Sequence, residues 1–283
     1  MTDARALLHA PFGVPGSGRV RYGAAMALFR EGRMSEAQLE VYREASAHDG
    51  RDPAPILAER GLPPVPGAEA GGPLRSLYDS ARYYLLGLVH PGAADVRAGL
   101  PADPGPERAV MPLPNPVVAA WLDPALDSVA RTHPLLAQAI RAAAQHLHWV
   151  TYDAYPRALI GDAFATGHAF ASIRGEDAPF TAADFDLGLF LIAPRTLYRD
   201  HHHAAPELYA PLTGPHHWRF GPGDALHAKP AHDPVWNPPH RPHLTRTGAT
   251  PFLAFFVWTR DVNQIAEVIP ADDWPELEAA AHA

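Results

Sequence analysis

The first half of the chain is dominated by apolar positions that recur at helical spacing. This pattern predicts a mainly helical stretch over 20–60, in which Ser35 and Gln38 have the spacing of a capping box. Proline and glycine dominate residues 61–73, which predicts a loop or linker. An amphipathic helix is expected over 74–90, because one side of that segment carries Leu74, Leu77, Ala81, Leu85 and Leu88.

The segment from residue 91 to 116 is rich in proline. Seven prolines lie between residues 91 and 116 and predict an irregular segment. The apolar, alanine-rich run over 117–149 predicts two helices that break around Pro134.

The pattern changes after residue 149 to short runs separated by turn residues. Such runs, several with aromatic and β-branched residues, predict an all-β sandwich or barrel. They cover 149–155, 170–175, 186–194, 208–214, 217–221, 224–230 and 252–261. We therefore expect an α-helical N-terminal region over 1–146, a β-barrel over 147–270 and a C-terminal helix or tail over 271–283.

Composition narrows the class of protein. The formal net charge is -8 and the sequence pI about 6.1, which argues against nucleic-acid binding. The sequence has no apolar run long enough for a membrane span and no pattern of a secretory signal at its start. Without cysteine it can form neither a disulfide nor a thiolate metal site. We expect a cytoplasmic protein that binds neither nucleic acid nor a membrane.

Histidines are concentrated in one part of the chain: nine of the 17 lie between His201 and His243. On a strand, His201 and His203 would point to the same face and His202 to the other. Glu207 can return to the first face if the strand resumes after a bend, and Tyr209 would then join it. Two imidazoles and a carboxylate on one face predict a divalent-metal site with open coordination positions.

The spacing of these residues resembles the first cupin motif. The part HxH(x)3E(x)6G runs from His201 to Gly214, while Arg195 occupies the position of the leading glycine. The second cupin motif is matched more weakly over 238–247. There His240 stands where glycine is usual, and the alignment makes His243 the fourth metal ligand. Thr247 replaces the final asparagine of that motif, and His240 is the alternative ligand if the register differs. His202 is expected to point outward or to support a ligand from behind. The remaining histidines of this region are expected to be ordinary polar or loop residues: His216, His217, His227 and His232.

A narrower resemblance covers residues 147–262. HxHxxxExY with Tyr198 before it, the later His243, and an apolar strand that carries Trp258 are similar to the cupin-type dimethylsulfoniopropionate (DMSP) lyases. The fold class implied is mainly β, with a jelly-roll-like cupin barrel preceded by the helical region. The helical region is expected to cover the barrel or to form the interface of a homodimer.

The resemblance implies a β-elimination on a small carboxylate substrate with a sulfonium group. Its products would be dimethyl sulfide and acrylate. Tyr209 is implied as the general base and Tyr198 as the second candidate for a catalytic role. The implied aromatic wall for the sulfonium is first Trp258, then Phe256, Trp218 and Trp236. The cofactor would be one divalent metal ion: zinc, iron, manganese or nickel, with zinc or iron preferred.

Two other functions remain open from the sequence. One is a different cupin metalloenzyme, either an Fe(II) dioxygenase or an isomerase that acts on a small organic acid. The other is a ligand-binding sensor, in which the barrel holds a ligand and the helical region reports its presence. Oxygen consumption coupled to substrate loss would identify the dioxygenase, and release of an unchanged ligand would identify the sensor.

Overall fold

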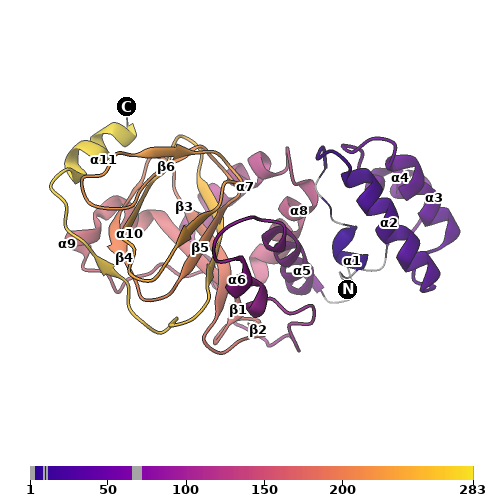
Figure 1. The fold of residues 1–283 in the computed structure, drawn as a ribbon, viewed down its shortest axis with the longest axis horizontal. Helices are drawn as coiled ribbons and strands as arrows, with labels where there is room; N and C mark the ends of the chain where they lie inside the picture. Colours follow the sequence, from indigo (N-terminus) through magenta and orange to yellow (C-terminus); the bar gives the residue numbers. More distant parts are fainter. Residues whose placement is uncertain (1–3, 9, 11, 66–71, 283) are drawn as a thin grey trace. The chain divides into compact units, whose positions relative to one another are not determined.

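A computed structural model describes residues 4–8, 10, 12–65 and 72–282. The chain forms two compact units (Figure 1). The first consists of residues 1–84 and 129–143, and the second of residues 85–128 and 144–283. The second unit thus includes residues 85–128, which precede the predicted barrel in the sequence.

The first unit is helical. Its elements are α1 (Ala4–Leu7), α2 (Ser17–Arg30), α3 (Glu36–Ala45), α4 (Pro53–Glu59), most of α5 (Gly72–Leu86) and α8 (Pro134–Ala143). The predicted capping box is confirmed, because the Ser35 side chain accepts from the Gln38 backbone and the Gln38 side chain accepts from the Ser35 backbone. The apolar face predicted for 74–90 is buried along α5, but Leu88 lies beyond the end of that helix. Residues 66–71 of the predicted linker lie outside the described residues.

The prediction of an irregular segment over 91–116 is wrong in part. Helix α6 (Ala93–Gly99) lies within it, because the prolines at 91 and 101 flank these seven residues and do not interrupt them. The two helices predicted for 117–149 are confirmed as α7 (Pro116–Val129) and α8, and Pro134 begins the second of them.

The second unit is built around two β-sheets (Figure 1). Among the described residues, one sheet has six strands in the order β2 (Phe180–Thr181), β1 (His168–Gly175), β3 (Asp186–Ile192), β10 (Phe252–Trp258), β5 (Glu207–Pro211) and β8 (Val235–Asn237). The other has five, in the order β11 (Glu267–Val268), β4 (Leu197–His202), β9 (His243–Arg246), β6 (His216–Arg219) and β7 (His227–Lys229). Short helices accompany them: η1 (Ala144–His146), α9 (Arg157–Ile160), α10 (Asp162–Gly167) and α11 (Trp274–His282).

The prediction of helices followed by strands is confirmed, with one correction among the strands. Residues 149–155 form no strand and pair only through an isolated bridge between Val150 and Phe170. The backbone leaves the sheet there because the Tyr152 N–H donates to the His168 ring at 3.0 Å and Tyr155 is buried in the core. The described strands pair within two separate sheets, without the hydrogen-bonded closure of a single barrel.

The core between the sheets is set by alternation along three neighbouring strands. Asp186 on β3 and Glu207 on β5 both pair in register with Trp258 on β10. Two positions along, Gly188 and Tyr209 pair with Phe256 in the same way. Paired residues share a face, so these six positions point together. Only glycine fits at 188, because a Cβ there would lie 2.4 Å from the Phe256 ring.

Candidate metal centre and aromatic pocket

Three buried histidines meet where β4 and β9 pair. His201 pairs in register with His243, and His203 follows directly after the end of β4. One ring nitrogen from each histidine lies within 4.8 Å of the other two. Each ring is oriented by a hydrogen bond between its Nδ1 and a backbone carbonyl, at 2.8, 2.8 and 2.9 Å, of Arg199, Ala205 and Arg241 respectively.

The chemistry of these ring nitrogens fits a metal ion. The Nδ1 contacts make Nε2 the acceptor nitrogen of each ring, which is the usual support for a histidine ligand. The Nε2 atoms of His201 and His243 are buried and have no hydrogen-bond partner among the described residues. Burial also lowers the pKa of both rings, which favours the neutral form that can bind a metal ion.

Glu207 adds a carboxylate to the three histidines. Its Oε2 lies 3.1 Å from His203 Nε2 and 3.4 Å from His243 Nε2. Its Oε1 accepts a hydrogen bond of 2.7 Å from the indole of Trp258. Burial opposes ionisation of Glu207, but positive charge at His203 and His243 would outweigh burial and hold its pKa below the usual range. The structure therefore brings together the four residues that the sequence predicts as ligands.

Two positions at which this chain departs from the cupin motifs keep the backbone conformation that favours glycine. Arg195 and His240 stand where those motifs have glycine, and both adopt left-handed backbone, with φ of 55° and 58°. The glycine that ends the first motif is retained for another reason: a Cβ on Gly214 would lie 2.5 Å from the backbone nitrogen of Ala231. The His240 N–H donates to the His203 carbonyl at 2.8 Å, which fixes the loop beside the histidine cluster.

The other histidines of this region lie outside the cluster. His202 points away from it, with its ring half-buried and 3.9 Å from Glu267. The cluster likewise does not include His216, His217, His227, His232 or His240.

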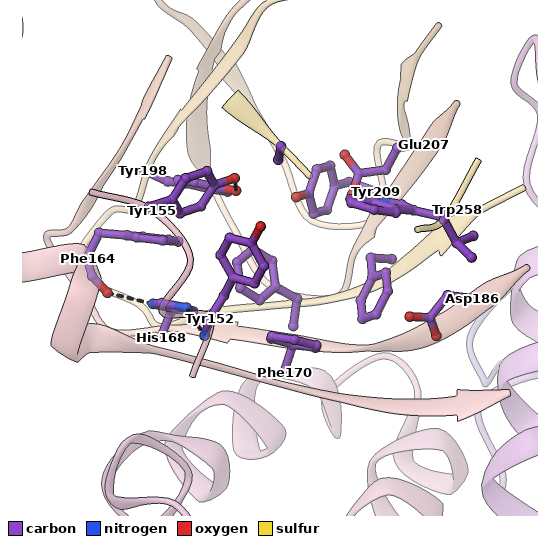
Figure 2. A pocket seen from close by; sticks show the side chains of 14 residues that line it. Tyr152, Tyr155, Phe164, His168, Phe170, Asp186, Tyr198, Glu207, Tyr209 and Trp258 are labelled. Carbon is purple, nitrogen blue, oxygen red and sulfur yellow. Dashed lines mark hydrogen bonds between the residues drawn. The ribbon is translucent and has the colours of Figure 1, made fainter. Parts of the chain in front are cut away.

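A pocket of about 220 Å³ opens beside the histidine–glutamate cluster. Figure 2 shows its wall, which is mostly aromatic. The lining consists of Tyr152, Tyr155, Phe164, His168, Phe170, Asp186, Phe190, Tyr198, Glu207, Tyr209, Phe256, Trp258, Val262 and Ala266. Four predicted residues, Tyr198, Tyr209, Phe256 and Trp258, therefore share one wall with Glu207.

Two tyrosines connect this pocket to the cluster. Tyr198 stacks on His201 with ring centroids 3.8 Å apart, and its hydroxyl lies 2.7 Å from that of Tyr155. Tyr209 lies two residues after Glu207 on the same face of β5. Burial raises the pKa of both Tyr198 and Tyr209, and the charge of Glu207 raises the pKa of Tyr209 further.

Trp218 occupies a different place from the one expected for a pocket wall. Its side chain is fully buried behind Tyr209, with the two rings 5.3 Å apart, and it also packs against Phe252. It is not among the residues that line the pocket. Trp236 is also absent from the lining, because it pairs with Leu208 on the other face of the sheet.

Sequence reasoning does not predict nine of the fourteen residues that line the pocket. They are Tyr152, Tyr155, Phe164, His168, Phe170, Asp186, Phe190, Val262 and Ala266. On β3, alternate residues share the face that lines the pocket: Asp186, Gly188 and Phe190. The sequence does not reveal this alternation, because the intervening leucines are fully buried as well and the strand is apolar on both faces.

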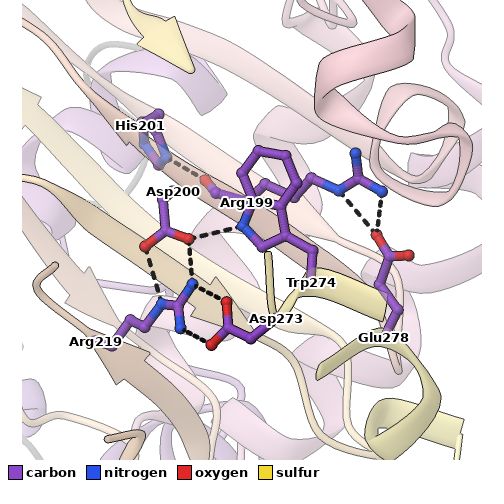
Figure 3. A network of polar contacts seen from close by, with 7 residues as sticks. All are labelled: Arg199, Asp200, His201, Arg219, Asp273, Trp274 and Glu278. Atoms are coloured by element: carbon purple, nitrogen blue, oxygen red, sulfur yellow. Dashed lines mark hydrogen bonds and ion pairs between the residues drawn. The ribbon is translucent and has the colours of Figure 1, made fainter. Parts of the chain in front are cut away.

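A buried ionic network supports the strand that carries His201 (Figure 3). The Arg219 guanidinium donates to both Asp200 and Asp273, and its Nε lies 2.9 Å from Asp200 Oδ1. Trp274, at the start of α11, donates its indole N–H to Asp200 at 2.7 Å. Because Asp200 directly precedes His201, the network ties the cluster to the C-terminal helix.

The fold and this site define a cupin-type protein with a candidate metal centre. The family model of dimethylsulfoniopropionate lyase matches residues 94–254, and the chain belongs to that family. The match begins well before residue 147, where the resemblance seen in the sequence began.

Individual relatives agree with the family. The chain is 29% identical over 181 residues to dimethylsulfoniopropionate lyase DddQ from Ruegeria pomeroyi, a match that covers 58% of this chain and 82% of the relative. The crystal structure of that DddQ superposes with a TM-score of 0.53 at 22% identity, covering 71% of this chain and 98% of the other. A chain from the crystal structures of the DMSP lyases RdDddP and RnDddQII gives a TM-score of 0.52 at 20% identity, covering 70% and 98%.

Membrane insertion through a helix finds no support in the described ranges. None of the helices there combines the length and the apolar character that crossing a bilayer would require.

Proposed function

We propose that the protein is a metal-dependent lyase that converts DMSP into dimethyl sulfide and acrylate. The observation that carries the proposal is the meeting of three histidines and Glu207 at one end of an aromatic pocket on whose wall Tyr209 stands. The family of the chain and the activity named for DddQ support the same substrate.

His201, His203, His243 and Glu207 would hold the metal ion, with zinc or iron as the expected identity. When bound there, a divalent cation would supply positive charge that stabilises the negative charge developing on the substrate carboxylate. Trp258 holds Glu207 in place through its indole N–H, so one aromatic residue serves both the pocket wall and the cluster.

We assign proton abstraction to the Tyr209 oxygen. The phenolate form would take the proton from the carbon next to the carboxylate. The carbon–carbon double bond of acrylate would then form as the carbon–sulfur bond breaks, and the bonding electrons would leave on sulfur as dimethyl sulfide. Because burial and Glu207 raise the pKa of Tyr209, its ionised form requires a positive charge close by. Tyr198, whose hydroxyl contacts Tyr155, is the second candidate.

The test is headspace dimethyl sulfide from metal-analysed wild type and from Tyr209→Phe. Loss of a general base costs about 10²–10⁴-fold in rate, so release should fall by that amount while the metal content stays the same. Full turnover in Tyr209→Phe would exclude this residue as the base. No release from metal-loaded wild type would contradict the lyase, and oxygen uptake with substrate loss would then indicate a dioxygenase.

A further inference from the structure

The pocket wall offers negative charge but no fixed positive charge. Among the residues that the structure describes, its lining contains two carboxyl groups, those of Glu207 and Asp186, and neither lysine nor arginine. Both ring nitrogens of His168, the histidine in this lining, already have hydrogen-bond partners. Its Nδ1 lies 2.6 Å from the Phe164 carbonyl and its Nε2 accepts from the Tyr152 N–H, so the neutral ring is the form that fits both contacts. Burial lowers the pKa of His168 to about 4, in agreement.

Asp186 lies two strands away from Glu207 in the six-stranded sheet. It begins β3 and pairs in register with Trp258, and Trp258 pairs in register with Glu207 on the far side of β10. The Cα atoms of the two acids are therefore roughly 10 Å apart, because neighbouring strands lie about 4.8 Å apart. Figure 2 shows Asp186 on the same side of the pocket as Trp258, with Tyr198 and Phe164 on the opposite side.

The carboxyl group of Asp186 has few partners. Its Oδ2 accepts one hydrogen bond of 3.0 Å from Ser172, and its Oδ1 is buried without a hydrogen-bond partner among the described residues. Burial raises the pKa of Asp186 to about 7. An unpaired buried carboxyl is costly to the folded protein and is stabilised when a cation arrives.

We propose that Asp186 is the counter-charge for the sulfonium head of the substrate and thereby selects onium carboxylates over carboxylates of the same shape with an uncharged head. The proposal rests on the proposed function. With the substrate carboxylate at the histidine end, three bonds separate its carbon from the sulfur, which places the cation along the wall between Trp258 and Asp186. Aromatic faces favour a cation there, and the carboxylate adds the directional charge that they lack.

The experiment uses two probes that differ in charge and not in shape. 3-(Trimethylammonio)propanoate carries the cation, while 4,4-dimethylpentanoate replaces its nitrogen by carbon. Calorimetry on the zinc-loaded full chain measures both affinities for wild type and for Asp186→Asn. We expect wild type to prefer the cationic probe by roughly tenfold or more, as for a hydrogen bond or contact to a charged group. Asp186→Asn should lose that preference, and it should bind 4,4-dimethylpentanoate with the same affinity as wild type.

Ser172→Ala is the matched control, because it removes the hydrogen bond that Ser172 donates to Asp186 and leaves the charge. It should keep the preference. An unchanged preference in Asp186→Asn would overturn the proposal, and so would equal losses in both variants. Dimethyl sulfide release by wild type is measured on the same samples. Its absence beside an intact cation preference would contradict the lyase function while supporting the role of Asp186.

Discussion

The two ends of the pocket place similar groups in opposite surroundings. Glu207 and Asp186 are acids on one face of one sheet, and both flank Trp258. At the Glu207 end, the carboxylate lies beside His203 and His243 and accepts from an indole N–H, and its pKa is held low against the effect of burial. At the Asp186 end a single hydroxyl donates, and burial raises the pKa to about 7. Neighbouring groups, and not position on the fold, thus decide which acid is charged before the substrate binds.

The largest expected effect on stability comes from the network behind the Glu207 end. Arg219→Ala leaves the buried Asp200, directly beside His201, without its cation and with only the indole N–H of Trp274 from this network, which should cost about 3–5 kcal/mol of unfolding free energy. Chemical denaturation measures the change. Arg157→Ala is the control, because its ion pair with Asp162 is exposed and should contribute no more than about 1 kcal/mol. Equal losses in the two variants would refute a special role for the buried network.

Trp258 pairs in register with both acids but donates a hydrogen bond to Glu207, so substituting it tests the Glu207 end alone. Trp258→Phe keeps an aromatic ring on the wall but removes the hydrogen bond to Glu207. Metal affinity, measured by competition with a chelator, should fall about 10–100-fold, as for other groups that orient metal ligands. Trp236→Phe makes the same change on the other face of the sheet and should leave metal affinity unchanged. If both variants bind metal as wild type does, the indole does not support the site.

The Asp186 end predicts a pH dependence of stability. The folded pKa of about 7 exceeds the ordinary value of 3.8, so the folded chain binds the proton more tightly than the unfolded chain. The stability from this group is therefore complete below about pH 4 and is lost as pH rises through 7. The stability of Asp186→Asn relative to wild type should accordingly increase between pH 5 and pH 8. Denaturation series at both pH values measure it, and a constant difference would contradict the raised pKa.

The smallest effect concerns the loop that leads to His243. His240 holds a left-handed φ of 58° and is exposed, so glycine should be the better residue there. His240→Gly should raise the unfolding free energy by about 0.5–1 kcal/mol, the left-handed penalty less the entropy of glycine. His227→Gly, on strand β7 without a left-handed φ, should instead lower it. Thermal unfolding compares the two, and destabilisation by both would argue against backbone strain at 240.

The histidine end could be predicted from the sequence because its information is local. His201, His203 and Glu207 lie within seven residues. The structure does not place them on one strand as expected: His201 is on β4 and Glu207 begins β5 in the other sheet, and the short turn between these strands keeps the three residues together. His243 required only the motif alignment, and its left-handed neighbour His240 occupies the glycine position of that motif. The specific ligand roles, the domain boundaries and the homodimer stay predictions.

The Asp186 end could not be predicted in the same way. Leu187, Leu189 and Leu191 are as buried as the residues that face the pocket, so β3 reads as a continuous apolar run. Tyr155 lies in a segment whose pattern predicts a strand, and its place beside Tyr198 depends on packing between distant parts of the chain. The core position of Trp218 could not be predicted either, because an aromatic residue at an inward-facing strand position can equally fill a core or line a cavity.

The most direct test of the two-ended pocket is the rate of dimethyl sulfide release against DMSP concentration, with Glu207→Gln and Asp186→Asn compared to wild type after metal loading. We expect Glu207→Gln to lose metal and with it nearly all turnover. We expect Asp186→Asn to keep its metal and to lose roughly tenfold in kcat/KM, mainly through a higher KM. Equal behaviour of the two variants, or an unchanged KM in Asp186→Asn, would contradict the two-ended pocket.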